Sequence, residues 1–325
     1  MRRKLILVFL TAMTLSACGV KTSNIGESIK INLTENRLGY NYGQMLIPAI
    51  SESRIITETY SDKIWDSCVD RENNITYRDN YLNDLKNYYK ELVVLKKIIT
   101  DNNISLTEPE KSRALKLSNI FYNETVLNSE EFKGVTLENC DDVFLDYFLI
   151  SKGKQELIAK NVKEVSEGEA RIMDFHVIEV SDYELANTLL EKLNAGENCV
   201  KLATLYSESD NILRSMEVDT EPENVKSVLT TLEDGGISPI ITDKGKYMLF
   251  KCVKSYDEEA TRKNKAKIKE QRESDYLLSL YNNFVKENPI DINEGEFDKV
   301  CKHAFDNFSG RDFFTLISED KNAGL

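Results

Sequence analysis

Few side chains in this sequence have the type and spacing needed for catalysis or metal binding. The chain has 325 residues but only two histidines, His176 and His303, and its six cysteines form no C-x-x-C pair. Zinc sites and dense disulfide frameworks need closely spaced ligands, so we expect no metal site and no cofactor. A histidine can exchange a proton near neutral pH, so His176 and His303 are the first residues to consider for catalysis. The alternative is a structural histidine that only hydrogen-bonds a neighbour, and packing or surface exposure is the default for His303.

One cysteine has a different predicted role, in lipid attachment. Three basic residues at positions 2–4 precede an apolar run that is too short to span a bilayer. Leu15-Ser16-Ala17-Cys18 follows and resembles a bacterial lipobox, which is cleaved before the cysteine. We therefore expect residues 1–17 to be a signal peptide and Cys18 to be lipidated. Residues 18–30 would be a tether that holds the protein outside the cytoplasmic membrane. The alternative is an ordinary secretory signal with an unrelated cysteine.

Composition and charge indicate a folded protein of two or three domains that does not bind nucleic acid. The chain is 41% hydrophobic and 30% charged, which is enough apolar content to bury a core, and its length predicts two or three domains. The formal net charge is −13, and cleavage before Cys18 would remove three cations and make it −16. Nucleic-acid binding needs a basic surface, so no nucleic-acid partner is expected.

Residues 170–256 contain short elements of both kinds in close succession. The first apolar stretch predicts a strand that places His176, Ile178 and Val180 on one face. Amphipathic helices follow. A Gly-Gly turn then leads to a short predicted strand over residues 237–241. A last strand closes the stretch, with Met248 and Phe250 on a shared face.

This order of elements resembles a parvulin-type peptidyl-prolyl isomerase domain. Parvulins open on an A-R-x-x-H-I-L-V strand and close on a G-Y-H-I-I-K strand, and their two histidines and a nearby acid lie above an apolar proline pocket. The resemblance implies that His176 is the first histidine, and so the candidate catalytic residue, and that Met248 replaces the second. The loop that usually supplies the acid corresponds to residues 210–221, where Asp210 and Asp219 are only nominal substitutes. The side chains that the resemblance implies for substrate binding are Met248, Phe250, Val225 and Leu229.

The flanking segments are mainly helical. Apolar residues step by three and four over residues 78–100, and Thr107 with Glu110 forms a capping box before the next predicted helix. A third helix is predicted from Thr136 to Ala159. This arrangement resembles the helical region of extracytoplasmic foldases of the PrsA/SurA type. The aromatic residues of the last segment are expected to pack on this helical module: Phe297, Phe305, Phe308, Phe313 and Phe314.

We therefore predict an α+β fold in which a SurA-N-like helical chaperone module is interrupted by a parvulin-like, FKBP-like domain. The expected limits are 31–165 for the first helical part, 166–256 for the parvulin-like domain, and 257–325 for the C-terminal helix and tail that complete the helical module.

Three functions remain open at this point. The first is a membrane-anchored chaperone for unfolded secreted polypeptides whose isomerase activity is weak or lost. The second is a fully active peptidyl-prolyl isomerase. The third is a ligand-binding surface lipoprotein on the same scaffold. Isomerisation of a proline peptide separates the first two, and one tight ligand in place of many weak clients would indicate the third.

The lipobox generates the first testable prediction. Cys18→Ala removes the thiol that would carry the acyl chains, so a bacterium expressing the variant should release it from the membrane fraction. Membrane fractionation with radiolabelled palmitate measures both effects. Equal membrane retention and equal labelling of variant and parent would rule out lipidation at Cys18.

Overall fold

The computed structural model of the chain describes residues 39–322, and the predicted signal peptide, Cys18 and tether lie outside them. The described part forms two compact units. The first, here called the helical unit, consists of the described residues up to Asn161 and those from Tyr276 onward. The second, here called the sheet unit, consists of Val162–Asp275 and is therefore inserted in the chain of the first. Helices dominate and the sheet is small and antiparallel, so the predicted α+β class is confirmed.

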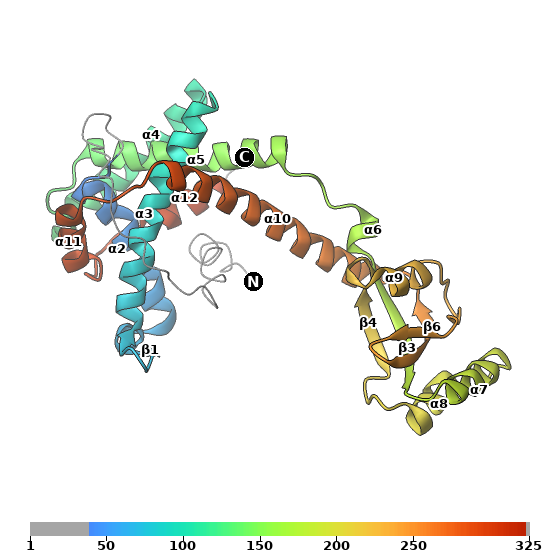
Figure 1. Ribbon diagram of the computed structural model, residues 1–325. Helices are drawn as coiled ribbons and strands as arrows, with labels where there is room; N and C mark the ends of the chain where they lie inside the picture. Colours follow the sequence, from blue (N-terminus) through green and yellow to red (C-terminus); the bar gives the residue numbers. More distant parts are fainter. Residues whose placement is uncertain (1–38, 323–325) are drawn as a thin grey trace. The chain divides into compact units, whose positions relative to one another are not determined.

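Seven helices make up most of the helical unit within the described residues (Figure 1). They are α2 (Tyr42–Tyr60), α3 (Tyr77–Asp101), α4 (Glu108–Glu124), α5 (Leu137–Asn161), the second half of α10 (Glu258–Glu287), α11 (Glu294–His303) and α12 (Phe313–Asn322). A hairpin of β1 (Cys68–Asp70) and β2 (Ile75–Thr76) precedes α3. The predicted capping box is present. The Thr107 hydroxyl accepts a hydrogen bond from the Glu110 backbone N–H, and the Glu110 carboxylate accepts one from the Thr107 backbone N–H.

The C-terminal aromatic residues pack on the helical unit as predicted. Phe313 of α12 is 1% exposed and lies edge-on to Phe144 of α5, with ring centroids 4.8 Å apart. Phe308 contacts Phe132 in the same way at 5.0 Å. These residues bury large apolar surfaces, so the end of the chain is an integral part of this core.

The sheet unit is built on four antiparallel strands in the order β4-β3-β6-β5. Their bounds are β3 (Ile172–Val180), β4 (Leu213–Glu217), β5 (Ile241–Asp243) and β6 (Lys246–Lys254). Two sequence expectations need correction. The short strand predicted over 237–241 is an isolated bridge at Ile237, with β5 starting only at Ile241. The segment 210–221, expected to be a loop, supplies β4 at the edge of the sheet.

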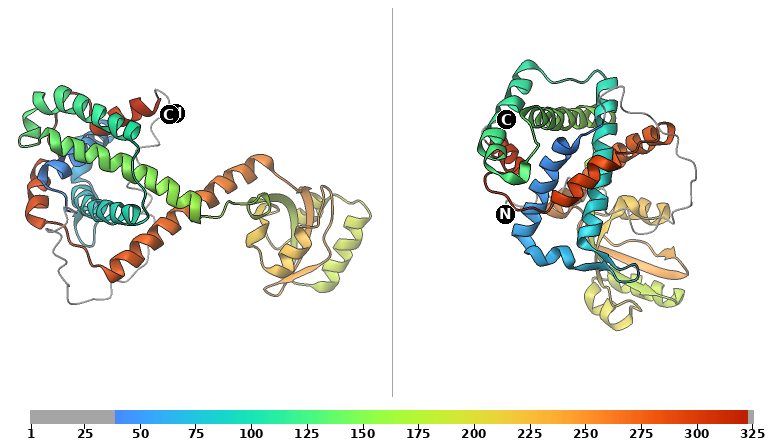
Figure 2. Two further views of the ribbon diagram at one scale, coloured as in Figure 1. Left: turned by 90° about the horizontal axis from the view of Figure 1, so that it is seen from above. Right: turned by 90° about the vertical axis from the view of Figure 1, so that its left-hand side faces the viewer.

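Helices cover both faces of this sheet, as the left view of Figure 2 shows. On one face, α7 (Tyr183–Asn194) and α8 (Cys199–Tyr206) pack over Ile178 and Val180. On the other face, α9 (Glu223–Leu229) packs over Phe175 and Val177. We call these the α8 face and the α9 face. Successive residues of β3 point to opposite faces, so one strand contributes to both cores.

The sheet unit extends further along the chain than residue 256. The first half of α10 belongs to it, because Thr261 is fully buried and its hydroxyl accepts a hydrogen bond from the Ile172 backbone at 3.0 Å. Asn264 donates to the Ala170 carbonyl at 3.1 Å. Where the chain re-enters the helical unit, the side chains of Asn161 and Tyr276 are hydrogen-bonded. No helix in the range 39–322 has the length and hydrophobicity required to cross a bilayer.

One half-buried carboxyl interrupts an apolar helix face in the helical unit. Glu52 of α2 follows Met45 and Ala49 at helical spacing and precedes Ile56, and these three pack against the buried side chains of α3. Burial, with a smaller contribution from Asp84, raises the pKa of Glu52 to about 8. At neutral pH this carboxyl is therefore mostly protonated in the folded protein and ionised in the unfolded chain.

Glu52 makes the stability of the helical unit depend on pH. Its contribution is fully present below about pH 4.5, where both states are protonated, and is lost as pH rises to about 8. Glu52→Gln should therefore raise the free energy of unfolding at pH 7.5 by roughly 1–3 kcal/mol and change it little at pH 4.5. Denaturation followed by the fluorescence of Trp65, the single tryptophan of the chain, reports on this unit.

Glu58 offers a matched control, because it lies on the same helix but is exposed and paired with Arg54. Glu58→Gln should change the stability by less than about 0.5 kcal/mol at either pH. The free energy of unfolding of the wild type should fall relative to that of Glu52→Gln as the pH rises from 4.5 to 8. If it does not, the pKa of Glu52 is not raised in the folded protein.

Candidate functional site

His176 is the middle residue of β3 and lies on the α8 face of the sheet. As predicted, it shares this face with Ile178 and Val180, but those residues are buried and His176 is half-buried. Its cross-strand partners are Leu213 of β4 and Lys251 of β6. The imidazole makes no hydrogen bond to any other described residue. A general base needs an orienting partner, and among residues 39–322 His176 has none.

Met248 lies on the opposite face of the same sheet. It pairs with Glu179 in the β3–β6 register, and its neighbour Phe250 pairs with Val177. Both side chains belong to the core beneath α9. The expectation that Met248 takes the place of a second histidine beside His176 is therefore wrong in its geometry. Since the sheet separates the two side chains, even a histidine at position 248 could not hydrogen-bond His176.

The four side chains expected to bind substrate do come together, but as a closed core. Phe250 and Leu229 are 0% exposed, Val225 is 3% and Met248 is 8% exposed. Phe250 packs edge-on against Phe175, with ring centroids 5.6 Å apart. A proline ring would have to displace these contacts to enter. The space that the resemblance assigns to a proline pocket is therefore filled by the protein's own side chains.

The two nominal acids are also unsuited to catalysis. Asp219 forms an ion pair with Lys226, 2.6 Å from carboxylate to ammonium, at the start of α9. Asp210 is exposed in the turn before β4. Neither carboxylate contacts His176 or Met248, so the structure does not assemble the predicted catalytic set.

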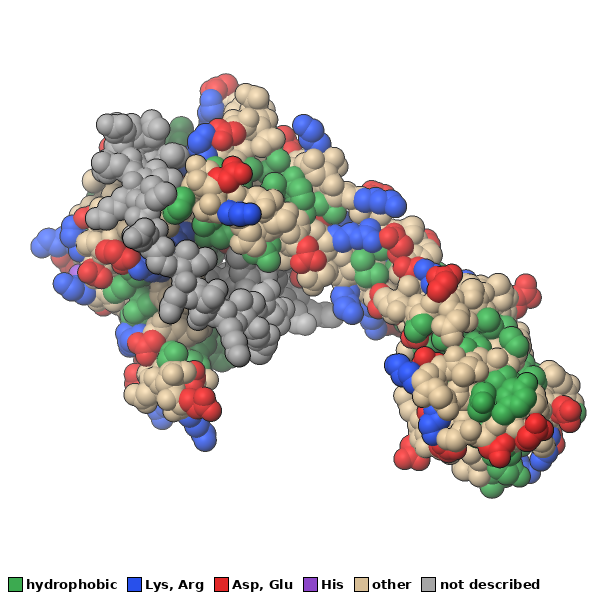
Figure 3. All heavy atoms as spheres, in the orientation of Figure 1, with side chains coloured by type: hydrophobic (Ala, Val, Ile, Leu, Met, Phe, Trp, Pro, Cys, Tyr) green, Lys and Arg blue, Asp and Glu red, His purple; other side chains and the backbone are tan. Residues whose placement is uncertain are grey.

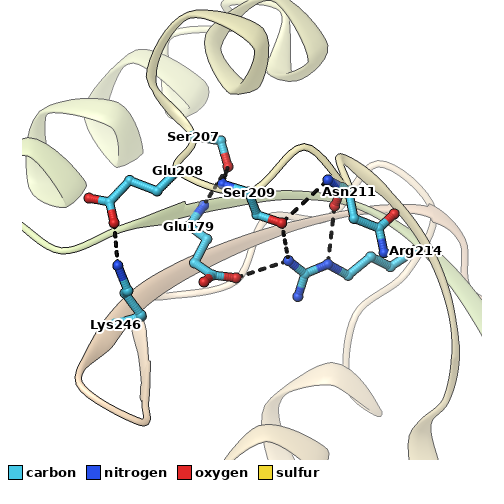
Figure 4. A network of polar contacts seen from close by, with 7 residues as sticks. All are labelled: Glu179, Ser207, Glu208, Ser209, Asn211, Arg214 and Lys246. Carbon is cyan, nitrogen blue, oxygen red and sulfur yellow. Dashed lines mark hydrogen bonds and ion pairs between the residues drawn. The ribbon is translucent and has the colours of Figure 1, made fainter.

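A polar network occupies the end of β3 and the turn that leads into β4 (Figure 4). The Arg214 guanidinium donates to the Glu179 carboxylate at 2.9 Å, to the Ser209 hydroxyl at 3.2 Å and to the Asn211 carbonyl at 3.1 Å. The Ser207 hydroxyl accepts from the Glu179 backbone at 3.2 Å. Each charged group in this network has a partner of opposite sign, so the network fixes the turn and leaves no free acid or base.

A second pairing ties this turn to the hairpin between β5 and β6. Glu208 is bound by the Lys246 ammonium and accepts from the Ser181 backbone and hydroxyl at 2.8 and 2.7 Å. These contacts, of which the hydrogen bond from Lys246 has the largest effect, lower the pKa of Glu208 to about 2. Glu208 is therefore ionised near neutral pH, and its role is structural.

Two buried cysteines are unsuited to act as nucleophiles, whereas Cys68 is an exposed free thiol on β1. Burial raises the pKa of Cys252 to about 11 and that of Cys140 to about 12, so both remain neutral thiols that pack as small apolar residues. No cluster of three or more potential metal ligands occurs in the range 39–322. His303 lies outside the sheet unit, exposed on α11, with its Nδ1 2.8 Å from the Asp306 carboxylate.

The helical unit contains one small cavity between α2, α3, α5 and α12. Its wall is mostly made of aromatic and aliphatic side chains and includes Tyr88 and Phe313. The charged group at this wall is Asp146, which is paired with Lys96 at 2.6 Å and accepts from the Tyr40 hydroxyl at 3.0 Å. The volume is about 20 Å³, which is room for roughly one water molecule. This cavity does not favour the ligand-binding alternative.

The feature that sequence reasoning missed is β4. Its signal was a weak two-residue alternation, in which Ile212, Met216 and Val218 are apolar and the residues between them are mixed. Arg214 occupies one of the positions that should be apolar, so the alternation typical of a strand is hidden. In the structure Arg214 lies opposite Phe175 of the α9 face, and its guanidinium donates to the Glu179 carboxylate.

Comparisons with known proteins add the following. No family model matches the sequence, and no curated protein matches it either. Solved structures similar to this chain are those of PrsA proteins. The peptidylprolyl isomerase PrsA from Bacillus cereus is 19% identical, covers 75% of this chain and 100% of that chain, and gives a TM-score of 0.35. The foldase PrsA from Streptococcus pneumoniae is 18% identical, with 71% and 96% covered and a TM-score of 0.29. PrsA from Bacillus subtilis is 14% identical, with 73% and 98% covered and a TM-score of 0.25.

Core and surface roles at the site can be separated by mutation. Phe250→Ala removes a fully buried ring and should destabilise the sheet unit by about 3–5 kcal/mol. His176→Ala removes a half-buried ring without a hydrogen bond and should cost less than about 1 kcal/mol. Amide hydrogen exchange in β3 and β6 measures both. If Phe250→Ala had the smaller effect, the closed-core description of the α9 face would be wrong.

Proposed function

We propose that this protein is a lipid-anchored extracytoplasmic folding factor that binds unfolded secreted polypeptides and has lost most or all of its isomerase activity. In this proposal Cys18 holds the protein at the outer surface of the bacterial cell membrane. Residues 18–30 act as a tether, the helical unit is a chaperone module, and the sheet unit is a parvulin-like domain. The similar solved structures are named as PrsA foldases and peptidylprolyl isomerases, which agrees with the resemblance of the sequence motifs.

The observation that carries the loss of isomerase activity is the placement of His176 and Met248 on opposite faces of one sheet. Rotation about a prolyl bond has a barrier near ~20 kcal/mol, and an enzyme lowers it by stabilising the twisted amide more than the planar one. Preorganised polar groups around an accessible pocket supply that preference. Here the α9 face is apolar and closed, and the polar groups nearby are already paired with one another.

Polypeptide binding does not need that polar set. Large apolar side chains are exposed on both units, among them Leu127, Tyr60 and Val69 in the helical unit and Leu205 and Leu213 in the sheet unit. On the face drawn in Figure 3, hydrophobic side chains lie among charged side chains of both signs. Scattered apolar contacts on a charged surface suit weak binding to many extended clients and keep the protein itself soluble.

Two assays test this proposal together. In a protease-coupled assay with a proline tetrapeptide, the protein should accelerate isomerisation by less than about 1% of an active parvulin at equal concentration. In a light-scattering assay, the same preparation should suppress aggregation of a chemically unfolded secreted protein. His176→Ala should change neither result by more than about twofold, because this imidazole contacts no catalytic partner.

A variant that restores the second histidine adds a further test. Met248→His restores the residue type of the parvulin strand but places it on the face away from His176, so it should not create isomerase activity. Parvulin-like rates in the wild type that His176→Ala abolishes would establish the active-enzyme alternative. Absence of any aggregation suppression would reject the chaperone function.

A further inference from the structure

The outer edge of β4 presents free backbone hydrogen-bonding groups. In the antiparallel β3–β4 pair, Val177 donates to the Ile212 carbonyl at 2.8 Å, so Ile212 and every second residue after it point their backbone groups toward β3. Arg214 and Met216 therefore complete the ladder. Leu213 and Ser215 direct their N–H and C=O groups away from the sheet. No described residue hydrogen-bonds these four groups, and β4 is the last strand on its side of the sheet (Figure 1).

This edge has little of the usual protection against strand addition. Natural edge strands are commonly blocked by proline, lysine, an inward-pointing charge or a covering segment. β4 contains no proline and no lysine, and its one inward-pointing charge, Arg214 on the α9 side, is neutralised by Glu179. Leu213 is 59% exposed and Ser215 is also exposed. The strand is thus both accessible and hydrogen-bond competent over at least three residues.

The charge around the edge indicates what it would accept. Residues 208–221 contain five carboxylates and one guanidinium. Lys246 neutralises Glu208 and Lys226 neutralises Asp219. Asp210, Glu217 and Glu221 have no ion-pair partner among the described residues; Asp210 precedes β4, Glu217 is its last residue and Glu221 follows it. A second copy of this edge would bring like charges together, whereas a chain with lysine or arginine would be attracted.

We propose that β4 is a client-binding edge, which adds an extended, basic segment of an unfolded polypeptide as a fifth strand of the sheet. Backbone bonds to Leu213 and Ser215 give affinity that is independent of client sequence, and the flanking carboxylates select for positive charge. Exposed Leu213 contacts an apolar side chain of the added strand. This inference rests on the proposed chaperone function and specifies one site through which it acts.

Ser215 provides the test, because its N–H points outward and its side chain bonds Asp174. Ser215→Pro removes the outward N–H without removing a β3 ladder bond, and Ser215→Ala removes the same hydroxyl but keeps the N–H. The probe is a fluorescein-labelled decapeptide of alternating lysine and valine, measured by fluorescence anisotropy at low salt. Ser215→Pro should weaken binding at least tenfold, and Ser215→Ala should change it less than twofold. A decapeptide of alternating glutamate and valine should bind at least tenfold more weakly than the lysine peptide.

Two further measurements use the wild-type protein, so their results do not depend on correct folding of the proline variant. In the wild type, the lysine peptide should slow exchange of the Leu213 and Ser215 amides at least tenfold. A lysine peptide N-methylated at every residue should bind at least tenfold more weakly, because neither of its edges has the N–H donors for strand addition. Protection that appears elsewhere, or equal binding by Ser215→Pro, would overturn the inference while leaving aggregation suppression intact. Protection of these amides on concentrating the protein alone would assign the edge to self-association and would also overturn it.

Discussion

The alternation of side chains along β3 is the constraint on which the sheet unit depends. One strand must serve two cores, because helices cover both faces of the sheet. Met173, Phe175 and Val177 therefore pack beneath α9, while Ile178 and Val180 pack beneath α7 and α8. A shift of the register by one residue would bring Asp174 and His176 into the α9 core and move Phe175 to the α8 face, so the register is strongly fixed. His176 is on the α8 face because the apolar residues on either side of it belong to the other core.

That constraint explains why the α9 face is stable and chemically inert. Phe175, Phe250, Leu229 and Val225 fill it, and each fully buried apolar side chain of this size contributes roughly 1.5–3 kcal/mol. Imidazoles or carboxylates in the same volume would lose that contribution and would also need hydrogen-bond partners. The charged residues lie instead at the strand ends and turns, where Glu179 pairs with Arg214 and Glu208 with Lys246. The same segment that would supply a catalytic acid is used here as an edge strand.

The helical unit follows a different rule, since segments far apart in the chain complete it. The residues before Asn161 and those after Tyr276 pack together in more than one apolar cluster: Phe144 meets Phe313 in one, and Trp65 meets Phe305 in another. An insertion between these segments leaves such contacts intact as long as the chain leaves and returns at neighbouring positions. The hydrogen bond between Asn161 and Tyr276 marks that position. Glu52 is the exception to the apolar pattern of this core, and its raised pKa makes the stability of the unit respond to pH in the physiological range.

The sequence alone determined the α+β class, the long helices α3, α4 and α5, the packing of the C-terminal aromatics and the face of β3 that carries His176. These follow from local periodicity and capping, which are properties of residues close together in the chain. Only the tertiary structure decided the position of Met248 relative to His176, because that depends on the register between two strands more than seventy residues apart in the chain. It also decided that residues 213–217 form an edge strand, since Arg214 obscures the alternation and only pairing with β3 fixes its role. Which backbone groups of that strand point to solvent is a consequence of pairing, and pairing between distant segments is not encoded in the local pattern of either one.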